Sequence, residues 1–318
     1  MNKKVSIVVT TYNRYGDLMR CLESVFKSDF RDFELIVVDD ASSDETADLT
    51  SERLCVLLGL GNTFPVKLIH NLENFRMVRT RNTGAKNASG EFVLFIDDDN
   101  IIDSQMISIL VEFAIANPDC GVVGPSMHYW SDKKKYLDYQ KINFFTGKTN
   151  GHINKSQDPS CDSDGVPNVF MIRSEVFSRA GYFDEDLMQT FTEPDFSFNA
   201  ARHGYRSVIV KAAVTYHDIP KKFSPRTLGG EFKSKAYCTI RNRALIVGRY
   251  GRWYHQLTYG LFFSWTWALI YSVLVLRFWR FDLIRLYWYG WRDGLRYLLS
   301  RRLVNSLPNV LDNYTQRL

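Results

Sequence analysis

Residues 92–100 read FVLFIDDDN, in which five large apolar residues lead directly into three consecutive aspartates. An apolar run that does not alternate predicts a strand buried on both faces. The carboxylates then lie at the C-terminal end of this strand, the edge at which open α/β sheets bind ligands. Three adjacent negative charges repel one another unless a cation joins them, and hard oxygen ligands suit Mg²⁺ or Mn²⁺. The sequence therefore suggests a metal-diphosphate site, with a solvated acidic turn as the structural alternative.

The composition is that of a folded, globular protein. Its 318 residues are 45% hydrophobic, which allows about two domains with a full core. The five cysteines include no C-x-x-C pair, so neither a disulfide framework nor a zinc site is expected, and a reducing compartment fits best. The apolar run near the N-terminus is too short for a secretory signal and reads as a first strand.

Charge and tryptophan are concentrated toward the C-terminal end. Residues 241–318 contain 12 Arg, no Lys and 3 Asp, a net charge of +9, whereas residues 1–240 carry −4. Six of the seven tryptophans also follow residue 240. A tail rich in Arg, Trp and Tyr predicts contact with a membrane surface and argues against nucleic acid as the partner.

Strands and helices are expected to alternate along the N-terminal half. β-branched or apolar runs at 5–10, 33–38 and 66–70 predict strands, and apolar residues at helical spacing predict helices over 15–27 and 77–88. This alternation predicts a mainly parallel, doubly wound sheet with right-handed crossovers and helices on its faces.

Three of the expected strands end in polar loops, and the topology brings these ends to one edge of the sheet. In the first loop, Thr10 offers a hydroxyl and Tyr12 a flat ring for stacking, and in the second, Asp40 can accept a hydrogen bond from an N–H on a base. Together they describe a nucleoside pocket. Turn formation and helix capping are the structural alternative for Asp39 and Asp40.

The order of three motifs resembles the N-terminal half of glycosyltransferase family 2 proteins, which have the GT-A fold. The motifs are VSIVVTTYNR, FELIVVDDASSDET and the stretch from ENFRMVRTRN to FVLFIDDDN, and the resemblance extends over roughly residues 4–245. It implies that the first strand and the Asp-Asp-x-Ser segment hold the base and ribose, and that the acidic triplet carries a D-x-D metal motif. The nucleotide-sugar site implied by the resemblance comprises Thr10, Tyr12, Asn13, Asp40, Arg81, Asp97 and Asp98, and its metal ligands are Asp97, Asp99 and His217.

A catalytic base is expected in the segment FTEPDFSFNAAR, because a sugar hydroxyl that attacks an anomeric carbon must lose its proton. Relatives have a Glu-Asp pair here, and the resemblance places Glu193 on the second, basic residue, with Thr192 in place of the preceding acid. Asp195 is the alternative base. The structural alternative for either carboxylate is a contact at the helix N-terminus beside Pro194.

His217 follows the strand-like run SVIVKAAVTY. Relatives have a histidine at this point that reaches the metal or the diphosphate, and imidazole is a suitable ligand for such ions. The resemblance therefore favours His217 as a ligand over a purely structural position at the end of a strand.

Residues 257–276 are uncharged over 20 positions, about 30 Å as a helix and long enough to cross a hydrocarbon core. Arginines flank this segment on both sides, so charge gives no orientation, and a helix lying in the interface fits equally well. The next segment, 278–299, alternates Arg with Trp, Tyr and Leu, which predicts an amphipathic interfacial helix. A soluble helical appendage or a dimer interface is the alternative.

The combined interpretation is an inverting, metal-dependent glycosyltransferase at the cytoplasmic face of the membrane. It would use Mn²⁺ or Mg²⁺ and move a sugar from a UDP- or dTDP-sugar to a glycan or lipid-linked acceptor. The alternatives are a sugar nucleotidyltransferase, whose G-x-G-T-R loop is replaced here by TTYNR, and a non-catalytic membrane adaptor. The predicted regions are a GT-A domain over 1–245, with a nucleotide-binding half (1–100) and an acceptor half (101–245), and a membrane-associating helical region over 246–318.

Overall fold

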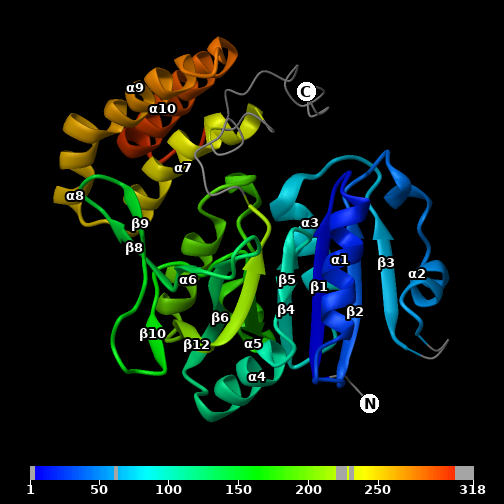
Figure 1. Ribbon diagram of the computed structural model, residues 1–318. Coiled ribbons are helices and arrows are strands. Elements are labelled where there is room, and N and C mark those ends of the chain that lie inside the picture. Colours follow the sequence, from blue (N-terminus) through cyan, green and yellow to red (C-terminus); the bar gives the residue numbers. More distant parts are fainter. Residues whose placement is uncertain (1–3, 61–63, 220–227, 229–232, 305–318) are drawn as a thin grey trace. The chain divides into compact units, whose positions relative to one another are not determined.

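The computed structural model describes residues 4–60, 64–219, 228 and 233–304. Within this part of the chain, one sheet of ten strands has the order β10-β12-β6-β11-β4-β1-β2-β3, with β5 beside β12 and β7 beside β6 (Figure 1). The strands are β1 (Val5–Thr11), β2 (Phe33–Asp39), β3 (Val66–His70), β4 (Phe92–Asp97), β5 (Asn100–Ile102), β6 (Cys120–Tyr129), β7 (Lys135–Leu137), β10 (Ser160–Asp162), β11 (Val169–Arg173) and β12 (Arg206–His217). A separate hairpin pairs β8 (Tyr139–Asn143) with β9 (Lys148–His152).

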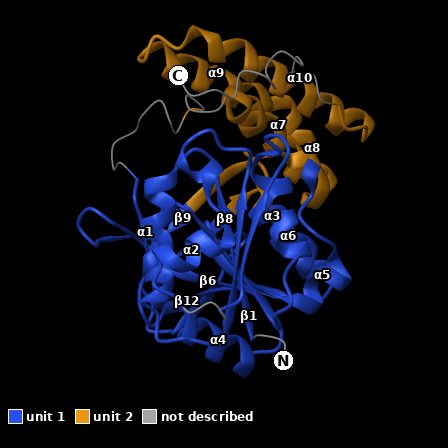
Figure 2. Ribbon diagram, turned by 90° about the vertical axis from the view of Figure 1, so that its right-hand side faces the viewer, with its two compact units in different colours: residues 1–141, 151–185, 193–219 blue, residues 142–150, 186–192, 220–318 orange. Residues whose placement is uncertain are grey.

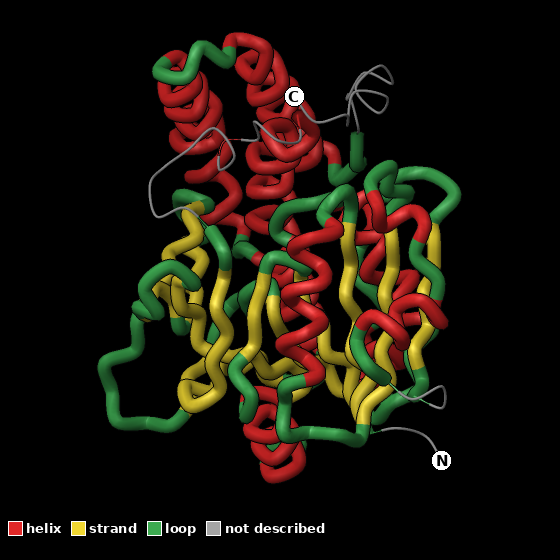
Figure 3. Tube along the Cα trace, turned by 45° about the vertical axis from the view of Figure 1, so that its right-hand side comes forward, coloured by secondary structure: helices red, strands yellow, loops and turns green. Residues whose placement is uncertain are grey.

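Helices cover both faces of this sheet (Figure 3). They are α1 (Tyr15–Phe26), α2 (Ser51–Leu57), α3 (Arg76–Lys86), α4 (Met106–Ala116), α5 (Ser174–Ala180) and α6 (Thr192–Arg202), with short 3₁₀ turns at η1 (Glu45–Asp48) and η2 (Glu185–Leu187). The sheet is parallel from β3 through β2 and β1 to β4 and mixed beyond, because β11 runs antiparallel between β4 and β6. The predicted α/β sheet flanked by helices is confirmed.

The apolar run of β4 faces two hydrophobic cores. Phe92, Leu94 and Ile96 pack in the core that contains residues of α1 and α4, whereas Val93 and Phe95 pack in the core that contains residues of α3, α5 and α6. A strand that is covered on both faces has no face in contact with water on which polar residues would alternate, which is why residues 92–96 are continuously apolar.

The chain divides into two compact units (Figure 2). Unit 1 comprises residues 1–141, 151–185 and 193–219 and contains the large sheet. Unit 2 comprises residues 142–150, 186–192 and 220–318, so it includes two short segments from earlier in the chain. The boundary predicted after residue 245 concerns functional regions and stays a prediction.

Unit 2 is helical and is built around α7 (Lys233–Tyr250), most of whose residues from 234 to 248 are buried. The others are α8 (Trp253–Thr258), a π-helical turn η4 (Tyr259–Phe263), α9 (Ser264–Leu276), η5 (Phe281–Leu283) and α10 (Ile284–Ser300). Trp253–Leu276 is the one helix in the described part of the chain that is long and apolar enough to cross a membrane by length and composition.

Helix α10, which falls in the segment predicted as an amphipathic interfacial helix, has one of its faces packed against protein. At Gly290 an added Cβ would lie 2.4 Å from the Tyr237 carbonyl oxygen, and at Gly294 it would lie 2.8 Å from the Ala244 Cβ. The absence of side chains at these two positions lets α10 approach the backbone of α7 closely. The buried Asp293 carboxylate accepts a hydrogen bond from the Tyr237 hydroxyl at 2.6 Å. Amphipathic periodicity is the same for a helix that packs on protein and one that packs on lipid, so the sequence pattern did not distinguish them.

Candidate active site

The three aspartates lie where the sequence places them, at the carboxyl end of β4 and in the turn to β5. Thr10 on β1 is in register with Asp97, and Thr11 is in register with Asp39 on β2, so the three loops do meet at one edge of the sheet. The Thr11 hydroxyl donates a hydrogen bond to Asp98 at 2.9 Å. A hydrogen bond therefore joins the triplet to β1, the first strand of the predicted nucleoside pocket.

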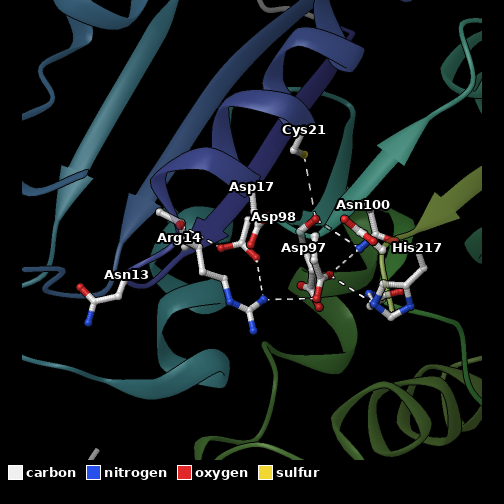
Figure 4. Close-up of polar contacts among 12 residues, drawn as sticks. Asn13, Arg14, Asp17, Cys21, Asp97, Asp98, Asn100 and His217 are labelled. Atoms are coloured by element: carbon white, nitrogen blue, oxygen red, sulfur yellow. Dashed lines mark hydrogen bonds and ion pairs between the residues drawn. The ribbon is translucent and has the colours of Figure 1, made fainter. Parts of the chain in front are cut away.

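Two arginines neutralise the triplet from different elements. Arg14, just before α1, places Nη1 3.1 Å from Asp98 Oδ1 and 3.2 Å from Asp99 Oδ2 (Figure 4). Arg81 on α3 places Nη2 2.7 Å from Asp97 Oδ1. Arg14 was not among the residues predicted for the site, although its position in the loop after β1 was a signal that it lies at this edge.

Burial makes ionisation of two carboxyl groups of the triplet costly. Burial raises the pKa of Asp97 and raises the pKa of Asp98 to about 7, even though Arg81 and Arg14 act in the opposite direction. Neighbouring carboxylates add to the increase in both pKa values. A divalent ion at this position would stabilise the ionised forms, so the local electrostatics agree with a cation site.

His217 ends β12 beside the triplet, in register with Asn100 of β5. Its Nε2 lies 3.3 Å from Asp99 Oδ1, and its Nδ1 lies 2.9 Å from the hydroxyl of Tyr136 on β7. Figure 4 shows the His217 ring beside the acidic turn. The structure thus brings together Asp99 and His217, two of the three predicted metal ligands.

The third predicted ligand, Asp97, directs its carboxylate to Arg81. Across the described residues, no group of three His, Cys, Asp or Glu side chains is placed to hold a metal ion. Mg²⁺ and Mn²⁺ are commonly bound through one or two protein ligands while phosphate oxygens of the substrate complete the coordination. The Asp99 carboxylate and the His217 imidazole, 3.3 Å apart, fit that arrangement.

We expect Tyr136→Phe to weaken Mn²⁺ binding about tenfold, because hydrogen-bonding partners of ligating histidines orient the ring and fix its tautomer. The measurement is a Mn²⁺ titration by electron paramagnetic resonance with nucleotide diphosphate present. Tyr216→Phe is the matched control, because Tyr216 precedes His217 on the same strand and its ring packs against Trp130. Equal affinities for Tyr136→Phe and the unmodified protein would contradict the orienting role.

Glu193 is linked to the triplet through a single guanidinium. Arg81 Nη1 lies 2.5 Å from Glu193 Oε1, while its Nη2 contacts Asp97. Only 1% of Arg81 is exposed. Burial acts to lower the pKa of Arg81, but Asp97 and Glu193 act more strongly in the opposite direction, so its pKa is raised. Asp195, two residues further along α6, is buried, whereas Glu193 is half-buried. Arg81 therefore lies between the acidic turn and the predicted base.

The other predicted nucleoside residues shape the loops at the same edge. Asp40 accepts hydrogen bonds at 2.8 Å from the backbone N–H groups of Phe75 and Arg76 and from the Asn71 side chain, which fastens the start of α3. Asn13 accepts a hydrogen bond from the Ser43 backbone N–H at 2.6 Å, and its side chain points away from the triplet in Figure 4. Asp40 thus has the structural role that the sequence left open as an alternative.

Backbone conformation at this edge is also unusual. Asn13, Ala41 and Arg76 adopt positive φ angles of 52°, 62° and 68°. Residues other than glycine seldom adopt this conformation, and such strain is concentrated at functional sites. Thr10 and Tyr12 lie on either side of the end of β1, half-buried.

A GT-A glycosyltransferase domain is the class of protein that this sheet and its acidic turn define, and solved structures agree. The chain matches mannosyltransferase PcManGT from Pyrobaculum calidifontis, solved with GDP-Man and Mn²⁺, with a TM-score of 0.58 and 16% identity over 93% of this chain and 88% of that one. It matches GalNAc-T7, solved with UDP, GalNAc and Mn²⁺, with a TM-score of 0.58 and 17% identity over 81% of this chain and 54% of that one. At these identities the similarity establishes the fold.

Residues 6–181 match the family profile described as glycosyl transferase family 2, and the chain belongs to this family. YwdF of Bacillus subtilis, an uncharacterized glycosyltransferase, is 27% identical over 67% of this chain and 74% of its own length. The GalNAc(5)-diNAcBac-PP-undecaprenol beta-1,3-glucosyltransferase of Campylobacter jejuni is 34% identical over 35% of this chain and 34% of its own length. Two uncharacterized Rickettsia glycosyltransferases match over 45% of this chain, which covers only 22% of their length.

Proposed function

We propose that the protein is an inverting, metal-dependent glycosyltransferase that moves a sugar from a nucleotide diphosphate donor to a glycan or lipid-linked acceptor at the cytoplasmic face of the membrane. The observation that carries this proposal is the bridge formed by Arg81. One guanidinium binds both Asp97, in the acidic turn, and Glu193, the proposed base. Through this bridge the proposed proton acceptor, Glu193, is separated by one guanidinium group from the carboxylates that would hold the donor.

Glu193 is the proposed base for direct displacement. Its carboxylate takes the proton of the acceptor hydroxyl as the oxygen attacks the anomeric carbon from the face opposite the diphosphate. The bond between the anomeric carbon and the diphosphate oxygen breaks, and its electron pair leaves with the diphosphate. A single displacement of this kind inverts the anomeric configuration. A Mn²⁺ or Mg²⁺ ion bound by Asp99 and His217 would neutralise charge on the leaving diphosphate.

The donor and acceptor classes are proposals based on chemistry and on relatives. UDP- and dTDP-sugars are the expected donors, and the Campylobacter relative named above acts on an undecaprenol-linked acceptor. The arginine-rich, apolar helices of unit 2 support a membrane location for such an acceptor. Membership of the family does not support the nucleotidyltransferase alternative.

The test is a binding and turnover screen with the purified full-length protein. We expect one nucleotide diphosphate among UDP, dTDP and GDP to raise the apparent melting temperature only when Mn²⁺ is present, because a ligand that binds the folded state stabilises it by mass action. The corresponding nucleotide sugar should release nucleotide diphosphate, slowly with water and faster with an acceptor. If no nucleotide binds and no sugar is released, the non-catalytic adaptor is the correct interpretation.

A further inference from the structure

One side of the rod formed by α8, η4 and α9 is apolar and exposed along its entire length. Each of the exposed large side chains lies three or four residues from another, the spacing of neighbours on one helical face, and their exposures lie between 42% and 74%. They are Trp253, Leu257, Leu261, Phe262, Trp265, Leu269, Ile270, Val273 and Leu276, which we call the apolar stripe. A contiguous surface of this kind on a protein marks a site of contact with another apolar body.

The opposite side of the same rod is packed against protein within unit 2. Ala268 and Val275 belong to a core shared with α7 and α10, and the Trp291 indole N–H on α10 donates to the Ser264 hydroxyl at 3.1 Å. In Figure 1, α9 and α10 run side by side. If α8, η4 and α9 insert into a membrane, α7 and α10, which pack on their buried side, must therefore accompany them.

Those attached helices are too polar to enter a hydrocarbon core with it. Helix α7 has the sequence KSKAYCTIRNRALIVGRY, and α10 has IRLYWYGWRDGLRYLLS, which together contain eight Lys or Arg residues. Charged groups at the centre of a bilayer are costly, and no second helix in the described ranges has the length and apolar composition needed for a span. A span by this rod would carry its charged neighbours toward the hydrocarbon core, which disfavours a crossing.

The two ends of the stripe are also alike in charge. Arg252 precedes it and Arg277 follows it, both exposed, and residues 252–277 contain no Asp or Glu. Trp253 follows Arg252 directly and Trp279 lies two residues after Arg277, and they are 74% and 80% exposed. Arginine and tryptophan at both ends place both ends at a headgroup surface, and cationic ends complement anionic phospholipid.

We propose that α8, η4 and α9 lie in the plane of the membrane, with the apolar stripe embedded in one anionic phospholipid leaflet and both ends on the same side. This inference rests on the membrane location in the proposed function and specifies its geometry. An interfacial helix of this type buries its apolar face about 5–10 Å deep, at the boundary of headgroups and acyl chains. In this geometry the described helices of unit 2 all remain on one side of the bilayer.

The first test measures flotation of the full-length protein with vesicles of phosphatidylcholine, with and without phosphatidylglycerol. We expect binding that is stronger with phosphatidylglycerol, and a loss of about tenfold or more in Leu261→Glu/Val273→Glu, which places charges in the stripe. Leu72→Glu is the matched control, because Leu72 is 99% exposed in unit 1, and it should bind like the unmodified protein. Donor binding with Mn²⁺, measured in parallel, should be the same in all variants.

The second test determines on which side each end lies. In a Cys161→Ser background, in which the four remaining native cysteines are buried, Arg252→Cys and Arg277→Cys are introduced separately and labelled with a membrane-impermeant maleimide in sealed membrane vesicles from expressing cells. We expect both positions to react from the same side. Reaction from opposite sides would overturn the in-plane geometry while leaving membrane attachment intact.

A different failure would affect the membrane location itself. If the full-length protein binds no vesicles but forms dimers that the stripe variant dissociates, the stripe is an interface between copies and this inference is wrong. The glycosyltransferase activity is measured separately by release of nucleotide diphosphate. A loss of that activity with vesicle binding intact would refute the proposed function alone.

Discussion

Asp99→Asn should abolish Mn²⁺-dependent binding of the nucleotide diphosphate and lower turnover by roughly 10²-fold or more, because metal stabilisation of a leaving diphosphate contributes several kcal/mol to the transition state. The amide has nearly the shape of the carboxylate but lacks its charge and is a poorer ligand for a hard cation. Asp99 lies in the turn after β4 and contacts His217 and Arg14, so it does not form part of the apolar core. The expected effect is therefore on binding, with the fold intact.

The measurement for Asp99→Asn is calorimetric titration of nucleotide diphosphate with and without Mn²⁺, alongside the melting temperature. Asp119→Asn is the matched control. Asp119 immediately precedes β6, at the opposite edge of the sheet, and forms an exposed ion pair with Arg206. Unchanged Mn²⁺-dependent affinity in a folded Asp99→Asn variant would reject this residue as a ligand.

Glu193→Gln should lower kcat by roughly 10²- to 10⁴-fold with little change in nucleotide affinity, because a general base acts on the acceptor proton in the transition state. Glutamine retains an oxygen that can accept the hydrogen bond from Arg81, so the bridge to Asp97 is conserved in geometry while the proton acceptor is lost. The measurement is steady-state kinetics together with donor titration.

Asp195→Asn distinguishes the two candidate bases. Asp195 lies on the same helix, α6, and is more buried than Glu193, so we expect its replacement to act mainly through stability, with a smaller loss of kcat. An inactive Asp195→Asn variant together with near-normal turnover in Glu193→Gln would assign the base to Asp195. The structural link between Arg81 and Glu193 makes the opposite result the expected one.

The sequence alone predicted the N-terminal half of the fold because each strand there is short, apolar and followed by a polar loop. Residues 92–97 form β4, and the strands predicted at 33–38 and 66–70 correspond to β2 and β3. The register of β1 against β2 and β4 then places the polar ends together without further information. The apolar pattern locates each strand and the parallel topology brings the strand ends to one edge, so together they predicted where the candidate site lies.

Contacts across the site were less predictable because they depend on distant segments. Tyr136 comes from β7, in a polar stretch whose strands are only partly buried and show no clear alternation. Arg14 and Asp98 are 84 positions apart in the chain, and Arg81 and Glu193 are 112 apart. The resemblance placed Arg81 near the nucleoside, whereas its hydrogen bonds in the structure go to Asp97 and Glu193. Only side-chain geometry reveals such pairings.

The composition of unit 2 has a consequence for the synthesis of the protein. Helix α7 binds two segments that precede it in the sequence, residues 142–150 and 186–192. Arg243 donates to the Gly147 carbonyl at 2.5 Å, and Asn242 donates to the Leu187 carbonyl at 2.7 Å. Translation proceeds from the N-terminus, so residues 142–150 and 186–192 leave the ribosome before the helix that binds them exists. A nascent chain that stalls before residue 233 would present Phe144 and Phe145 without the helical partners they have in the finished protein, such as His255. Chaperones and proteases recognise exposed apolar segments of this kind, so we expect incomplete chains to be removed rather than to accumulate as a free catalytic fragment.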